Sequence, residues 1–165
     1  MLMRLAGLLF CLSLQAPLAF AQSSPTLPAS LNLQQDGAQA LSEGKPLILF
    51  FSLPDCPYCK VVRQAYLLPM LHEGEPAERP VIRELQVTSA ESLVGFDGSR
   101  TTQAAVAKQF GVRIAPTVVF VDATGNVLAA PIVGGDGHGF YSAYLDKALA
   151  ESARKIAAGR LGKAR

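Results

Sequence analysis

Two cysteines three positions apart are the residues of this chain best suited to do chemistry. Cys56 and Cys59 enclose Pro57 and Tyr58, which are predicted to support the site, in a Cys-Pro-Tyr-Cys motif. Thiolates are nucleophiles and also ligands for soft metal ions, and two such thiols can form a disulfide with each other. A disulfide that served only the fold would close a ring too short to constrain the unfolded chain much. The motif therefore favours dithiol–disulfide exchange, and a copper(I) carrier that uses the two thiolates is the alternative.

The motif lies between a predicted strand and a predicted helix. Residues 47–51 are continuously apolar and of strand length, which predicts a strand buried on both faces of a sheet. A helix is predicted to begin at Pro57, because proline fits the first turn and the apolar residues after it recur at helical spacing. The N-terminus of a helix carries a partial positive charge that favours a thiolate. We therefore predict Cys56 as the nucleophile and Cys59, one turn further along, as the resolving thiol.

The rest of the chain alternates predicted helices with predicted strands. The helix that begins at the motif is predicted to kink or end at Pro69, because proline interrupts helical hydrogen bonding. Along the remaining chain the patterns predict a helix over 32–44, a loop over 72–80, a strand over 81–87, a loop over 88–100, a helix over 101–110, a hairpin of strands 117–121 and 127–128, a flexible break over 134–137 and a final helix from Phe140. This order predicts one α/β domain over 33–157, followed by a basic tail over 158–165.

Residues 1–21 have the pattern of a cleavable secretory signal peptide. Arg4 precedes an apolar run, and Ala-Phe-Ala at 19–21 has the small residues that a cleavage site needs. The apolar run is short for a bilayer span, and an uncleaved anchor is the alternative. Cleavage would remove Cys11 and leave 22–32 as an extended lead-in. We therefore expect a periplasmic protein, whose two remaining cysteines meet an oxidising compartment.

The chain resembles the thioredoxin superfamily over most of residues 33–151. The features that carry the resemblance are the apolar strand, the Cys-Pro-Tyr-Cys motif, and an Ile-Ala-Pro-Thr segment at 114–117, about 60 residues after the motif. The resemblance implies a thioredoxin fold, an α/β fold with a central mixed β-sheet flanked by helices. It also implies that the bond between Ala115 and Pro116 is cis and that both residues support the active site. Within the superfamily, the chain is most similar to periplasmic thioredoxins of the SoxW kind and to the catalytic domains of Dsb-type proteins.

The sequence departs from this resemblance in two ways. Many thioredoxins carry a buried carboxylate six residues before the first cysteine, where it assists proton transfer to and from the second thiol. This chain has Phe50 at that position, so proton transfer must rely on solvent or on another group. Dsb-type isomerases carry a dimerisation domain ahead of the catalytic domain, whereas about ten residues separate the predicted signal peptide from the first predicted helix. We therefore expect a monomer that acts as a reductase.

Charge and histidine content limit the partners. The 165 residues include 15 Lys and Arg against 13 Asp and Glu, and the net charge of +2 offers no strong electrostatic case for nucleic acid. A metal site would need more ligands than two thiolates, and the two histidines, His72 and His138, are each predicted as solvated loop residues. We therefore expect no cofactor and no resident metal. The predicted partners are protein thiols and disulfides, together with a periplasmic or membrane electron donor.

Overall fold

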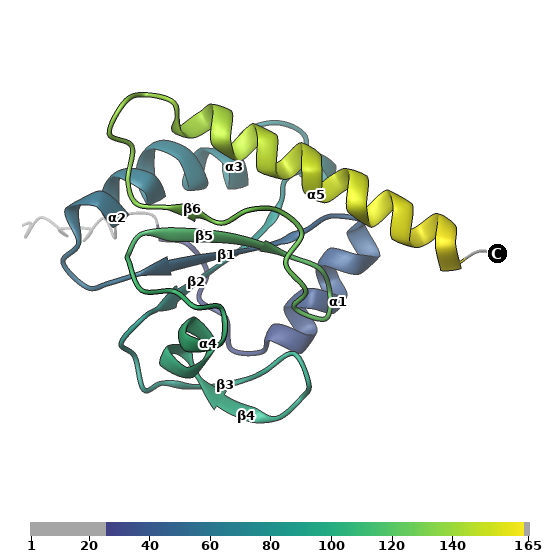
Figure 1. The fold of residues 1–165 in the computed structure, drawn as a ribbon, viewed down its shortest axis with the longest axis horizontal. Helices are drawn as coiled ribbons and strands as arrows, with labels where there is room; N and C mark the ends of the chain where they lie inside the picture. The colour runs from purple at the N-terminus through teal and green to yellow at the C-terminus, as the bar shows by residue number, and fades with distance from the viewer. Residues whose placement is uncertain (1–25, 164–165) are drawn as a thin grey trace, which may run out of the picture.

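A four-stranded mixed sheet lies at the centre of the computed structural model, which describes residues 26–163 (Figure 1). Its strand order is β2-β1-β5-β6, with β1 (Leu47–Ser52) parallel to β2 (Val81–Gln86) and antiparallel to β5 (Thr117–Val121). The last strand, β6 (Ile132–Val133), pairs antiparallel with β5. The predicted mixed sheet is therefore confirmed. The predicted signal peptide and the first residues of the predicted lead-in lie outside the described residues.

Strand β1 is buried along its whole length, as its apolar run predicts. All six of its residues are buried. Successive side chains of a strand point to opposite faces of a sheet. Ile48 and Phe50 accordingly belong to one core cluster, whereas Leu47, Leu49 and Phe51 belong to the other. The sheet therefore needs a layer of helices on each face.

Helices cover both faces of the sheet (Figure 1). One layer consists of α1 (Leu33–Glu43) and α4 (Gln103–Gln109). The other consists of α5 (Tyr141–Lys163) and a helical run made of α2 (Pro57–Val62), the π-helix η1 (Arg63–Leu67) and α3 (Leu68–His72), with a short 3-10 turn, η2 (Pro76–Glu78), between α3 and β2. No helix within residues 26–163 has the length and apolarity to cross a membrane.

The helical run that begins at the motif passes through Pro69 without ending there. The π-helix η1 precedes this proline, and the Leu68 N–H donates to the carbonyl of Arg63, five residues back. In a regular α-helix a proline ring clashes with the carbonyl four residues earlier and leaves it without a donor. The π-helical turn changes this local pairing, so α3 continues to His72.

The predicted loop over 88–100 contains regular structure. Within it β3 (Ser92–Val94) pairs antiparallel with β4 (Arg100–Thr102) to form a separate two-stranded sheet. Helix α4 begins after Thr102, two residues later than predicted, because the Thr102 side chain accepts a hydrogen bond from a backbone N–H of the first turn and caps the helix. The short strands were missed because neither has an alternating apolar pattern.

The strand predicted at 127–128 is reduced to a single antiparallel bridge between Val127 and Val121. Beside this bridge, the Leu128 N–H donates to the Phe120 carbonyl at 2.8 Å. The Asp122 carboxylate accepts the Asn126 N–H at 3.0 Å and closes a turn directly after β5. The chain then leaves the sheet, and the strand that pairs with β5 is β6, further along.

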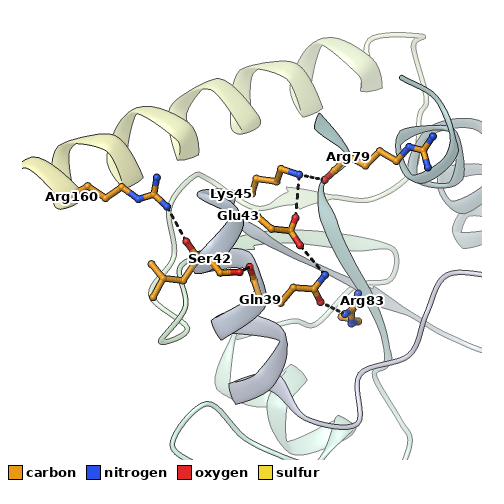
Figure 2. A network of polar contacts seen from close by, with 8 residues as sticks. Gln39, Ser42, Glu43, Lys45, Arg79, Arg83 and Arg160 are labelled. Carbon is orange, nitrogen blue, oxygen red and sulfur yellow. Dashed lines mark hydrogen bonds and ion pairs between the residues drawn. The ribbon is translucent and has the colours of Figure 1, made fainter. Parts of the chain in front are cut away.

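Helix α5 continues to Lys163 and so includes most of the segment predicted as a basic tail. Arg160 of this segment donates from Nη2 to the Leu41 carbonyl at 2.9 Å (Figure 2). Leu41 lies in the last turn of α1, which ends at Gly44 with a left-handed φ of 74°. A Cβ on Gly44 would lie 2.7 Å from Arg160 Nη1, so the glycine also leaves room for the guanidinium. Arg160 therefore places a cation at the negative end of α1.

Polar contacts also tie α1 to the edge strand β2. Arg83 on β2 donates from Nη2 to Gln39 Oε1 at 2.9 Å and from Nε to Asp36 Oδ1 at 2.6 Å, and Figure 2 shows the Arg83–Gln39 bond within its wider network. In the lead-in, the Ser30 hydroxyl donates a hydrogen bond to the Asp36 carboxylate. The backbone of the lead-in also forms a parallel bridge with Glu84. The outer edge of β2 is therefore covered by the lead-in, which removes a row of exposed backbone groups.

Replacing Arg160 by Ala should lower the free energy of unfolding by about 0.5 kcal/mol, because the last turn of α1 loses a hydrogen bond to a cation. The measurement is urea unfolding at low ionic strength. Arg154→Ala on the same helix is the matched control, since the Arg154 side chain is exposed and forms no hydrogen bond within residues 26–163. Equal losses in the two variants would contradict the capping role.

Candidate active site

The Cys-Pro-Tyr-Cys motif lies where the chain passes from β1 into α2. The chain turns through Asp55, a non-glycine residue with a φ of 53°, and Cys56 then caps α2. The Cys56 sulfur accepts a hydrogen bond from the Cys59 N–H at 3.1 Å, and Pro57 occupies the first turn, as predicted. The two cysteines form a disulfide with a Cα–Cα distance of 5.2 Å. The pair is therefore at the N-terminus of a helix and able to cycle between dithiol and disulfide.

The two cysteines differ in exposure. Cys56 is partly exposed, whereas Cys59 is fully buried among the core side chains that include Phe50 and Val62. A reaction partner in solvent can therefore approach Cys56 but not Cys59. This difference supports the predicted order of attack, with Cys56 first and Cys59 second.

Ala115 and Pro116 lie at the same end of the sheet as the motif. The peptide bond between them is cis, as predicted. The β1–β5 register places Thr117 opposite Phe51, so Pro116 comes next to the end of β1, where the chain leaves for Cys56. Pro116 is buried, and Ala115 and Cys56 pack against the same core cluster. The structure therefore brings all of the predicted site residues to one end of the sheet.

The loop over 134–139 forms a wall beside the motif that no sequence pattern predicted. Tyr58 is 66% exposed, and its ring lies against Gly135. A Cβ on Gly135 would lie 3.0 Å from Tyr58 Cδ1, so a larger residue here would require the Tyr58 side chain to shift. The Gly134 N–H also donates to the Pro116 carbonyl at 2.8 Å. This segment, predicted as a flexible break, is therefore attached to both halves of the site.

Asp136 anchors that loop to the helical run behind the motif. Its carboxylate accepts the phenolic proton of Tyr66 and the Gly139 N–H, the latter at 2.7 Å. The hydrogen bond from Tyr66 lowers the pKa of Asp136, and the same bond raises the pKa of Tyr66. Tyr141, the first residue of α5, stacks on Tyr66 with ring centres 4.9 Å apart, and burial raises the pKa of its phenol. The loop is therefore held by a charge-assisted hydrogen bond over the normal range of pH.

A groove of about 800 Å³ has Cys56 in its wall and an ion pair among its other lining residues. Glu84 on β2 binds the Arg63 guanidinium through both carboxylate oxygens, with a distance of 2.9 Å from Arg63 Nε to Oε2. Ser52 at the end of β1 donates to Glu84 Oε1 at 2.6 Å. The Arg63 guanidinium also lies 5.6 Å from the centre of the Phe50 ring. No sequence pattern predicted this pair, because Glu84 fits the outward polar position of an alternating strand.

Metal ligands are sparse around the motif. No group of three or more His, Cys, Asp and Glu residues that could hold a metal ion occurs in the part of the chain that the structure describes. His72 ends α3 and His138 lies in the loop over 134–139, and both are exposed. The copper(I) alternative therefore rests on the two sulfur atoms alone.

Some solved structures are similar to this chain. No curated protein matches the chain. Similar solved structures include oxidised mitochondrial thioredoxin 3 of Saccharomyces cerevisiae, with 18% identity and a TM-score of 0.49 over 76% of this chain and 94% of that one. A thioredoxin-fold protein of Helicobacter pylori has 16% identity and a TM-score of 0.46 over 74% of this chain and 94% of that one. The thioredoxin of Fasciola hepatica has 14% identity and a TM-score of 0.49 over 76% of this chain and 99% of that one.

The family profile described as Thioredoxin-like domain matches residues 33–149, which is most of the chain. The matched range contains the motif, the strand that leads into it and the cis proline. The chain therefore belongs to the thioredoxin-like domain family, and its Cys56–Cys59 pair is that of a thiol–disulfide oxidoreductase.

Proposed function

We propose that this oxidoreductase acts in the periplasm as a monomeric reductase of protein disulfides. The observation that carries the proposal is the cysteine pair at the N-terminus of a helix, with one sulfur open to solvent and the other buried. The Cys56 thiolate attacks one sulfur of the client disulfide, and the other client sulfur leaves as a thiolate. Cys59 then loses its proton and attacks the Cys56 sulfur, which releases the second client thiol. Two electrons pass to the client, and a periplasmic or membrane dithiol donor restores the reduced pair.

The reducing direction is supported by the form of the domain. The chain between the motif and Pro116 consists of short elements of the sheet and its helices, without the large inserted helical domain of the superfamily's oxidases. Its motif and proline segment resemble those of periplasmic thioredoxins of the SoxW kind and of Dsb-type catalytic domains. The signal-peptide pattern of residues 1–21 supports export to the periplasm, with the mature chain beginning at Gln22.

The client is proposed to lie across the surface around the disulfide. Large apolar side chains are exposed there: Tyr58 at 66%, Ile114 at 57% and Val133 at 58%. Ala115 precedes the cis proline, is partly buried and packs against the same core cluster as Cys56. An extended client segment can form backbone hydrogen bonds at such an edge while its cystine reaches Cys56. The surface therefore fits an unfolded or extended polypeptide better than a compact small molecule.

The roles of the two cysteines can be separated by substitution. Cys59→Ser should accumulate mixed disulfides with client proteins, because Cys56 still attacks but nothing resolves the intermediate. Cys56→Ser should form none and should lose the acceleration of insulin reduction in dithiothreitol. Preferential alkylation of Cys59 in the reduced protein at about pH 6 would contradict the assignment. Tight stoichiometric copper(I) binding without any acceleration of insulin reduction would instead support the carrier function.

The direction of electron flow can be measured as an equilibrium potential. Titration of the mature protein against glutathione should give a value nearer to about −270 mV, which is typical of a reductase, than to about −120 mV, which is typical of a strong periplasmic oxidant. Thiol trapping of intact cells should find the pair mainly reduced. A potential close to the oxidant value, with the pair oxidised in the periplasm, would reverse the direction.

The loop anchored by Asp136 is expected to affect client binding rather than thiol chemistry. Tyr66→Phe removes the hydrogen bond that holds the loop, so the KM for insulin should rise about threefold. The rate at which Cys56 reacts with a small disulfide should stay unchanged. The pKa of Asp136 is lowered in the folded state, so ionised Asp136 stabilises the loop. This stabilisation is complete at a pH above the ordinary carboxyl pKa, and it is lost as the pH falls through the lowered pKa. Ser142→Ala, on the exposed face of α5, is the control.

A further inference from the structure

The resolving step needs a proton acceptor for a thiol that is buried in the disulfide form of the protein. Cys59 is fully buried, and in the reduced protein its thiol must lose a proton before the sulfur can attack Cys56. Burial in apolar surroundings disfavours the thiolate. Phe50, on the strand beneath the pair, offers no group that could take the proton.

Glu84 is the carboxylate carried by the strands of the four-stranded sheet. In the parallel pairing of β1 and β2, Phe50 is opposite Glu84, so both side chains point to the same face of the sheet. Phe50 and Cys59 belong to one core cluster on that face, together with Ile82, two residues before Glu84 on β2. Glu84 therefore lies on the strand next to Phe50, and it points to the face of the sheet against which Cys59 packs.

Arg63 connects this carboxylate to the helix that carries Cys59. The Arg63 N–H donates to the Cys59 carbonyl, which places the two residues one helical turn apart. The Arg63 side chain then extends back to the sheet and holds Glu84 through both carboxylate oxygens. Only 14% of the Glu84 side chain and 21% of the Arg63 side chain are exposed. The carboxylate is therefore fixed in position by its partners, on the same side of the sheet as the helix turn of Cys59.

The groove that contains Cys56 in its wall also contains Glu84 and Arg63, so solvent space joins Cys56, the disulfide partner of Cys59, to the carboxylate. The groups that face Glu84 directly are the Arg63 guanidinium and the Ser52 hydroxyl. The other charged side chains that line the groove come from three further segments: Asp55 from the turn before the motif, Lys60 from α2 and Glu91 from the segment after β2. Glu91 accepts a hydrogen bond from the buried Gln103 side chain and forms no contact with Arg63.

We propose that Glu84 accepts the proton of Cys59, through the solvent of this groove, during the resolving step, with Arg63 as the residue that positions it. This inference rests on the proposed function. In the step the Cys59 S–H bond breaks and the proton passes to the Glu84 carboxylate. The Cys59 sulfur then forms a bond with the Cys56 sulfur, the bond from Cys56 to the client sulfur breaks, and the client leaves as a thiolate. Glu84 returns the proton to solvent or to that leaving thiolate.

The test separates the two attacks in one experiment. Reduced full-length mature protein is mixed with dithiobis(nitrobenzoate), which releases a coloured thiolate when Cys56 attacks and a second one when Cys59 resolves the mixed disulfide. Glu84→Gln should slow the second release about tenfold at about pH 7 and move its pH profile to higher pH, because hydroxide must then remove the proton. The matched control is Glu91→Gln, which removes one carboxylate from the same groove and should keep the wild-type rate and pH profile of the second release.

Two outcomes would overturn the proposal. The first is a second release in Glu84→Gln with the same rate and pH profile as in Glu91→Gln. The second outcome is a result for the double variant Glu84→Gln and Arg63→Gln. This variant is made in any case, because removing both partners leaves no unpaired charge from the ion pair, whether or not Glu84→Gln alone folds. Its second release should also be slow, and a wild-type rate in this variant would contradict the role of Glu84. Failure of the proposed function would appear differently, as an absent or slow first release in the wild-type protein.

Discussion

Burial of β1 on both faces is the constraint on which the rest of the structure depends. Its six buried residues need apolar cover from two layers of helices, and those layers fix where every other element packs. The turn that follows a central strand needs solvent or polar partners for its backbone groups, so it must lie at the surface. The chain turns there through Asp55 and begins a helix at once. The cysteine pair is therefore held at the edge of the core, with one sulfur outside and one inside.

The same strand brings distant residues to the pair through its two neighbours. Antiparallel pairing with β5 delivers Pro116 to the end of β1, and parallel pairing with β2 places Glu84 beside Phe50. A half-buried carboxylate is costly unless it is paired and hydrogen-bonded, and Arg63 and Ser52 supply both forms of compensation. The site thus combines an apolar layer under Cys59 with a charged groove beside Cys56.

Long-range polar contacts order two segments that have no periodic pattern of their own. The hydrogen bond from Tyr66 to Asp136 holds the glycine-rich loop against Tyr58, and the bond from Arg160 to the Leu41 carbonyl holds the end of α5 against α1. The first contact gives a hydrogen-bond donor to a carboxylate, and the second gives a donor to a carbonyl at the end of a helix. Segments rich in glycine or in basic residues are therefore parts of the folded domain here.

Local patterns in the sequence determined the elements that carry the reacting atoms. The apolar run of β1, the start of a helix at Pro57 and the cysteine spacing depend on neighbours within a few residues, and the sequence therefore predicted them correctly. The cis bond before Pro116 was predicted from the resemblance and was confirmed. The short strands β3, β4 and β6 escaped prediction, because strands of two or three residues carry too little periodicity to be distinguished from loops.

Only the tertiary structure decided what surrounds the cysteines. The ion pair of Glu84 with Arg63, the wall at Gly135 and the capping of α1 by Arg160 each join residues at least 21 positions apart in the chain. Local sequence restricts the backbone of each residue but does not specify its distant partner, because that choice follows from strand order, register and the packing of helices on the sheet. The sequence thus determined the chemistry of the site, and the fold determined its surroundings.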